Sequence, residues 1–335
     1  MTWACGGSRR EGSGGRRLAA LLPPAAVPRP TAAGLPLAAL LPVGLLLGAA
    51  AAPAAAQAPG PATRAVEARR ALAPSGLLRI WNLSGSVRVV AWDRDSVVVT
   101  GRVPVDEKFF CGGRREAMKC GVDVPPGSEE AAGRSTLEVR VPVRAQLWLK
   151  SGDGDVVVSG FAGDLDAYSV SGRIDVSGAA RVLTLESMGG DIVVAGSATT
   201  VRARTAGGRI TLGARIDDAT ATSVSGDVVV RGGAIRRGRL ESIDGAVRWR
   251  GPLAEGADVE ITNHGGSVEL FLPPDASGAF EVHTYVGTVQ SDFGPAKLLG
   301  ARDQNGRELS FVLGRPAGAR VTVRTFKGPV AIRRL

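Results

Sequence analysis

The sequence predicts an all-β protein, folded as a parallel β-helix or β-solenoid of about eleven short rungs with 18–21 residues per rung. Two observations lead to this prediction. One glycine recurs every 18 residues through the middle of the chain, at Gly154, Gly172, Gly190, Gly208 and Gly226, and a fixed short period is typical of repeat architectures. Apolar and mostly β-branched residues stand two and four positions after each glycine, which is the alternation of a strand with one buried face.

Each repeat also contains a second strand before its glycine, where apolar or small residues alternate in the same way. A small polar residue stands three positions before the glycine every time. This column is Ser151, Ser169, Ser187, Thr205, Ser223, Ser242, Asn263 and Thr284. Its hydroxyl and amide groups can bond to each other or to the turn backbone. We therefore expect a structural polar ladder at the corner between the two strands of each rung.

Repeats of this length cannot bury their own apolar face, so they must stack on one another. Equivalent strands are expected to pair in parallel, about 4.8 Å apart. The pattern continues on both sides of the core, and an irregular rung is predicted around Gly306 with Leu309 and Phe311. The terminal rungs are then those near Leu78 and Ile332, where open strand edges would permit end-to-end self-association.

The beginning of the chain predicts export. Residues 1–34 carry five arginines, residues 35–52 are apolar, and alanines precede Gln57. Basic, apolar and small-residue regions in this order are typical of a secretory signal peptide. We therefore predict an export leader at residues 1–56, cleaved near Ala56, with an uncleaved membrane anchor as the alternative. The mature protein is expected outside the cytoplasm, in the periplasm, at the cell surface or secreted.

Residues 57–76 are rich in Pro and Ala and are predicted to be a linker before a single domain at 77–335. Removal of residues 1–56 lowers the formal net charge from +9 to +5. No run of basic residues interleaved with aromatics is present, so no nucleic-acid partner is expected.

Residues 104–134 interrupt the repeat and contain Cys111 and Cys120. Two cysteines nine residues apart in an exported protein favour one disulfide that closes a small loop. A metal site or a redox pair fits less well, because the chain has only two histidines, His264 and His283, and no Cys-x-x-Cys motif. No metal site and no cofactor are therefore predicted.

The residue after each anchor glycine alternates in charge. The series is Asp155, Arg173, Asp191, Arg209 and Asp227. On stacked rungs these side chains would form an acid–base ladder that fixes the strand register, and they are the candidate interaction face. A glycosidase or lyase cleft is the alternative, but an arginine between successive acids lowers their pKa values, whereas a general acid needs a raised pKa. No catalytic residue is predicted.

A second column stands three residues after the glycine and alternates between Val157, Val193 and Val229 and the polar residues Asp175 and Thr211. Two interpretations remain open for the valines. They could form an outward apolar strip for a partner, or they could reflect strand propensity on a half-covered face.

Two segments resemble a known family. Residues 141–156, followed by serial Ser-Gly-Asp-Val and Gly-Gly-Arg-Ile units, and residues 263–274 are similar to the DUF4097 family of bacterial adhesin-like proteins. The resemblance covers about residues 77–335. It implies a β-helix-like fold, an exported or membrane-associated location and no established catalytic residues. The insertion at 104–134 departs from the family pattern.

The expected function is that of an exported, non-catalytic adhesin or interaction scaffold at the cell envelope. Its partner could be a polysaccharide, the cell wall or an envelope protein. Two alternatives remain open. One is an accessory protein of envelope-stress signalling that binds a membrane partner, and the other is a carbohydrate-active β-helix enzyme.

Overall fold

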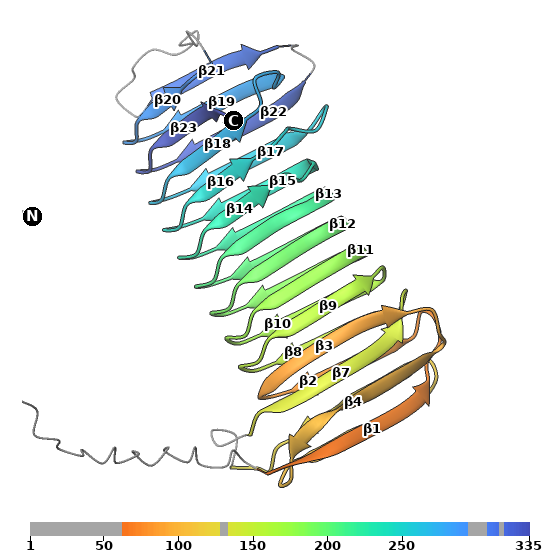
Figure 1. Cartoon of the computed structure of the whole chain (residues 1–335). Helices are drawn as coiled ribbons and strands as arrows, with labels where there is room; N and C mark the ends of the chain where they lie inside the picture. The colour runs from red at the N-terminus through yellow and green to blue at the C-terminus, as the bar shows by residue number, and fades with distance from the viewer. Residues whose placement is uncertain (1–61, 128–132, 294–306, 315–317) are drawn as a thin grey trace, which may run out of the picture. The chain divides into compact units, whose positions relative to one another are not determined.

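The computed structural model describes residues 62–127, 133–293, 307–314 and 318–335. The predicted export leader at 1–56 lies outside these residues. Every regular element in the described part is a β-strand (Figure 1). No described segment forms a helix that is long and apolar enough to cross a membrane.

The strands form two ladders that meet at the corner of each repeat. The first ladder contains the strands that precede the corner. In spatial order these are β6 (Ala117–Asp123), β2 (Leu77–Asn82), β8 (Gln146–Ser151), β10 (Asp164–Ser169), the C-terminal halves of β11 (Ile174–Ser187), β12 (Ile192–Thr205) and β13 (Ile210–Ser223), then β15 (Ile235–Ser242), β17 (Asp258–Asn263), β22 (Ala319–Thr325) and β19 (Gly278–Thr284).

The second ladder contains the strands that follow the corner. Its order is β7 (Ser135–Pro142), β3 (Gly85–Trp92), β9 (Val156–Phe161), the N-terminal halves of β11, β12 and β13, then β14 (Val228–Arg231), β16 (Val247–Arg250), β18 (Val268–Leu272), β23 (Val330–Arg334) and β20 (Val289–Ser291). All these pairings are parallel, and Figure 1 shows the strands stacked in a row.

The register aligns equivalent residues of successive repeats, as the 18-residue period requires. Leu165 lies beside Leu183, and Leu183 lies beside Val201. These residues, like Ile174 and Ile192 of the second ladder, are almost completely buried. The inward residues of both ladders join one hydrophobic core. The alternation read from the sequence is therefore the alternation of buried and exposed side chains.

The spatial order of the rungs departs from the chain order at both ends. Strand β2 lies between β6 and β8, and β23 lies between β18 and β20. The prediction that the rungs near Leu78 and Ile332 are terminal is therefore wrong. The rung of β2 is internal because β6, which follows it in the chain, lies outside it, and the rung of β23 is internal because β20, which precedes it, lies outside it. The repeat pattern alone does not reveal this order.

At the end of the stack that holds β6 and β7, the outermost strands are antiparallel. Strand β1 (Thr63–Ala71) pairs with β4 (Ser96–Pro104), which also pairs with β7, and β5 (Lys108–Gly113) pairs with β6. Strand β1 falls inside the predicted linker, so that prediction is wrong for residues 63–71. The Ala-rich composition hid an amphipathic strand in which Val66 and Ala68 are buried against the core.

The other end also has an antiparallel edge. Strand β21 (Arg307–Leu313) pairs with β19. The predicted irregular rung around Gly306 is therefore wrong for Leu309 and Phe311, which belong to this edge strand and pack on the core. The ring of Phe311 stacks on Phe280 of β19, with the ring centroids 5.0 Å apart.

The corner explains why the anchor residue is glycine. A Cβ on Gly208 would overlap the carbonyl oxygen of Gly190 in the preceding repeat and would lie 2.9 Å from the Asp191 nitrogen. The same overlap with the preceding glycine exists at Gly172, Gly190, Gly226, Gly245 and Gly266. Close approach of two backbones, not an unusual φ, therefore requires glycine at these positions.

The polar column lies beside these glycines and is buried throughout. Thr205 Oγ1 accepts a hydrogen bond from the Gly208 N–H at 3.0 Å and donates one to the Gly190 carbonyl at 3.4 Å. Ser223 repeats this arrangement with Gly226 and Gly208. Each of these two hydroxyls thus links its own repeat to the preceding one and satisfies backbone groups that are closed to water.

Candidate functional site

The charged residues that directly follow the anchor glycines lie at the surface, where the second strand of each repeat begins. Asp155 Oδ1 accepts a hydrogen bond from the Arg173 backbone N–H at 3.0 Å, and Asp191 Oδ1 accepts one from the Arg209 N–H at 2.8 Å. These aspartates therefore bind the backbone of the next repeat. Sequence reasoning assigned them only to side-chain ion pairs.

The ion pairs of this column are concentrated around Asp227. Its carboxylate lies 3.3 Å from Arg209 and 2.7 Å from Arg248, and it accepts the Ala246 N–H at 3.0 Å. Arg173 instead pairs with Asp175 of its own strand, at 3.0 Å. Partial burial raises the pKa of Asp227, but the hydrogen bonds from Ala246 and Arg248 and the arginine charges outweigh it, so the net pKa is lowered.

An exposed apolar column runs along the corner, two residues before each anchor glycine. We call it the corner ridge, and its apolar and aromatic members are Leu83, Val170, Met188, Ala206, Val224, Ile243, Phe326 and Tyr285. Met188 is 56% exposed and Val224 is 46% exposed. The positions are contiguous, because the carbonyls of Val170 and Met188 accept backbone N–H groups of the following repeat.

The ridge ends in a stack of rings. Phe326 lies between His264 and Tyr285, with centroid distances of 4.9 and 5.1 Å and nearly parallel planes. From Leu83 to Tyr285 the ridge covers ten rungs, roughly 40 Å at the strand spacing. Contiguous exposed apolar surface of this kind marks interaction sites.

Sequence reasoning missed the ridge and considered the valines of the second ladder instead. Val157 and Val193 are half-buried, and Val229 is buried. The sequence carried a signal for the ridge, since the residue after each hydroxyl is apolar in most repeats. That position lies on the outside of the corner, because the buried hydroxyl before it points inward.

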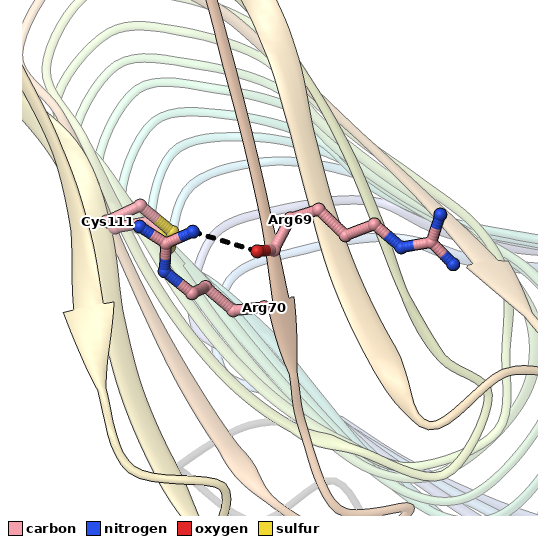
Figure 2. Close-up of a disulfide and its surroundings, with 4 residues drawn as sticks. Arg69, Arg70 and Cys111 are labelled. Carbon is pink, nitrogen blue, oxygen red and sulfur yellow. Dashed lines mark hydrogen bonds between the residues drawn. A yellow bond between two sulfur atoms is a disulfide. The ribbon is translucent and has the colours of Figure 1, made fainter.

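Strands β5 and β6 of the insertion belong to the strand stack. Cys111 of β5 and Cys120 of β6 face each other and are joined by a disulfide. Figure 2 shows this disulfide, with Arg69 and Arg70 of β1 in its surroundings, where Arg70 donates a hydrogen bond to the Arg69 carbonyl. The hairpin adds β6 to the first ladder beside β2.

The described residues contain no group of three or more His, Cys, Asp or Glu side chains that could hold a metal ion. His264 stacks on Phe326, while His283 lies on β19. The buried serines and threonines bond to backbone groups of the corner.

The stacked parallel strands with a repeated glycine corner define an all-β repeat protein. The family model of DUF4097, described as Toastrack, matches residues 132–333, which is more than half of the chain. The chain therefore belongs to the DUF4097 family. Residues 62–127 lie outside the match. A search of curated proteins found no match.

Several solved structures are similar to this chain, among them the following two. A "putative adhesin" from Bacteroides fragilis has 12% sequence identity and a TM-score of 0.45, covering 83% of this chain and 100% of its own. A "putative adhesin" from Parabacteroides distasonis has 10% identity and a TM-score of 0.41, covering 81% of this chain and 97% of its own. Both are too distant to transfer a function to this chain.

Proposed function

We propose that the protein is a non-catalytic, adhesin-like binding scaffold that is exported to the cell envelope. The observation that carries this proposal is the corner ridge, which presents exposed apolar side chains on eight of its ten rungs. Water-exposed turns are usually polar, and a contiguous apolar line favours a bound partner. The family membership and the leader-like sequence of residues 1–56 support the same proposal.

A rigid stack suits a binding scaffold. The ridge side chains stand on turns whose glycines pack backbone to backbone and whose buried hydroxyls, such as those of Thr205 and Ser223, bond to the turn backbone. Little conformational freedom is therefore lost when a partner binds, which favours affinity. The partner would lie along the ridge, as an extended polysaccharide, cell-wall polymer or envelope protein. End-to-end assembly is not part of the proposal, because the outer strands β1, β5 and β21 run antiparallel to their neighbours and β1 carries several charges.

The test uses the mature chain from Gln57 and insoluble cell-envelope material. We expect the protein to sediment with this material and to release no soluble sugar products. A variant with Met188→Ser, Val224→Ser and Ile243→Ser should sediment at least fivefold less. The matched control is Val312→Ser, which removes an exposed valine of β21 that is outside the ridge.

Three results would contradict the proposal. Release of soluble products would make the protein an enzyme. Failure of the unchanged protein to sediment would remove the adhesin assignment. An equal loss for the Val312→Ser control would show that the ridge is not the binding surface.

A further inference from the structure

A groove opens at the N-terminal end of the stack, beside the first ladder. It has a volume of about 460 Å³, and its walls include Trp81, Phe110, Lys119, Val122 and Lys150. This volume lies within the range of small-ligand sites. All these residues except Lys150 precede the part of the chain that matches the family model. The groove is therefore largely a product of the first rung and the cysteine hairpin.

The hairpin positions two of these side chains. Phe110 and Lys119 are the neighbours of the bonded cysteines Cys111 and Cys120. Gly121 lies opposite both Phe110 and Trp81, and a Cβ there would lie 3.1 Å from the Phe110 ring and would overlap the Trp81 carbonyl oxygen. The missing side chain allows the Phe110 ring to lie over the strand, so the wall is already formed before a ligand binds.

The two lysines of the groove rest on aromatic rings. Lys119 Nζ lies 4.1 Å from the centroid of the Trp81 ring and 5.3 Å from that of Phe110, and Lys150 Nζ lies 5.6 Å from that of Tyr168. Cation–π contacts of this kind hold an ammonium group in place. An ammonium group has three N–H donors, so donors remain for an anion.

These lysines differ from the arginines of the molecule. In the described part of the chain, every ion pair joins an arginine to a carboxylate, and neither Lys119 nor Lys150 has such a partner. One carboxylate, Asp123, also lines the groove, and the exposed Arg79 lies beside Lys119 in register. The groove thus keeps a net positive charge, because two lysines and one aspartate line it.

We propose that this groove binds an acidic glycan, a sugar chain that carries carboxylates. The carboxylates bond to Lys119 and Lys150, and the C–H faces of the sugar rings pack on the half-buried Phe110 ring and on the exposed side chains of Leu83 and Val170. Both interactions match the composition of the groove, an apolar surface with a few charged groups. The inference rests on the proposed function, since it names a ligand class for the same non-catalytic scaffold.

The strand pairing argues against an extended peptide as the ligand. Strands β2, β6 and β8 are each paired on both sides, so a peptide backbone could pair only with the outer edge of β5 and not with the strands that carry Lys119 and Lys150. The groove also continues into the corner ridge, because Leu83, Gly152 and Val170 line it as well. A polymer bound in the groove could therefore extend along the ridge.

The test is calorimetric titration of the mature, disulfide-bonded chain with tetragalacturonic acid, its neutral methyl ester and tetraglutamate. We expect binding of the acidic sugar that weakens with added salt, with at least tenfold weaker binding of the other two. The double variant Lys119→Gln and Lys150→Gln should lose at least tenfold in affinity. The control is Lys327→Gln, because Lys327 also rests on an aromatic ring, Phe326, but lies outside the groove.

Several outcomes would overturn the inference. These are no binding of tetragalacturonic acid, equal binding of its methyl ester, equal binding of tetraglutamate, or an equal loss in the Lys327→Gln control. Thermal melting of each variant checks that it is folded. The envelope sedimentation assay separates the two proposals, because the scaffold function stands if sedimentation through the ridge persists while the groove fails to bind the acidic sugar.

Discussion

The substitution Gly208→Ala tests the packing of the corner. The new Cβ would overlap the Gly190 carbonyl and lie 2.9 Å from the Asp191 nitrogen. Both groups belong to the backbone, so neither can rotate away, and the repeats must move apart. Overpacking of this kind costs about 1–3 kcal/mol. The Gly208 N–H and carbonyl also bond to Thr205 and Ser223 at 3.0 and 3.4 Å, and loss of one buried bond adds about 1 kcal/mol.

We therefore expect Gly208→Ala to lower the free energy of unfolding by about 2–4 kcal/mol, measured by equilibrium unfolding in urea. The neighbouring Gly207→Ala is the matched control. Its Cβ would meet its nearest atoms only at 3.8 Å or beyond, so its stability should be unchanged or slightly higher. If the two variants differ by less than about 0.5 kcal/mol, close backbone approach is not the reason for the glycine column.

Three further predictions concern the corner, the charge ladder and the hairpin. Ser223→Ala leaves the Gly226 N–H and Gly208 carbonyl unpaired and should cost about 1–3 kcal/mol in urea unfolding, whereas the exposed Ser225→Ala should cost almost nothing. Asp227→Asn should cost about 1 kcal/mol at neutral pH. Because the folded state lowers the pKa of Asp227, its contribution is present above the ordinary Asp pKa and is lost as the pH falls through the folded value. The difference between the two proteins should therefore shrink as the pH is lowered below about 3.9, and a constant difference would contradict this. Replacement of Cys111 and Cys120 by Ala should cost about 2–3 kcal/mol, and an unchanged urea midpoint would contradict a structural role for the disulfide.

The sequence determined the repeating unit of this protein. The 18-residue glycine period, the apolar alternation and the hydroxyl column predicted two short strands that meet at a corner, and these features appear in register. Such local features are readable because each repeat solves the same packing problem with the same residue types. The family resemblance is confirmed as well, since the DUF4097 model matches residues 132–333.

Part of the candidate site was also readable from the sequence. The charged column from Asp155 to Asp227 is at the surface. Its use as an interaction face stays a prediction. The bonds from Asp155 and Asp191 to backbone N–H groups of the next repeat could not be foreseen, because the alternating charges suggested side-chain pairs and the position of the free N–H depends on the corner geometry.

Only the tertiary structure decided the order of the rungs and the composition of the ligand surfaces. A repeated pattern permits any rung to stack on any other, so it could not show that β2 and β23 are internal. The groove depends on this order. It brings Lys119 of the hairpin beside Trp81, and Trp81 beside Lys150, from three strands that are separated in the chain. Contacts between distant segments follow from stacking, which local alternation does not specify.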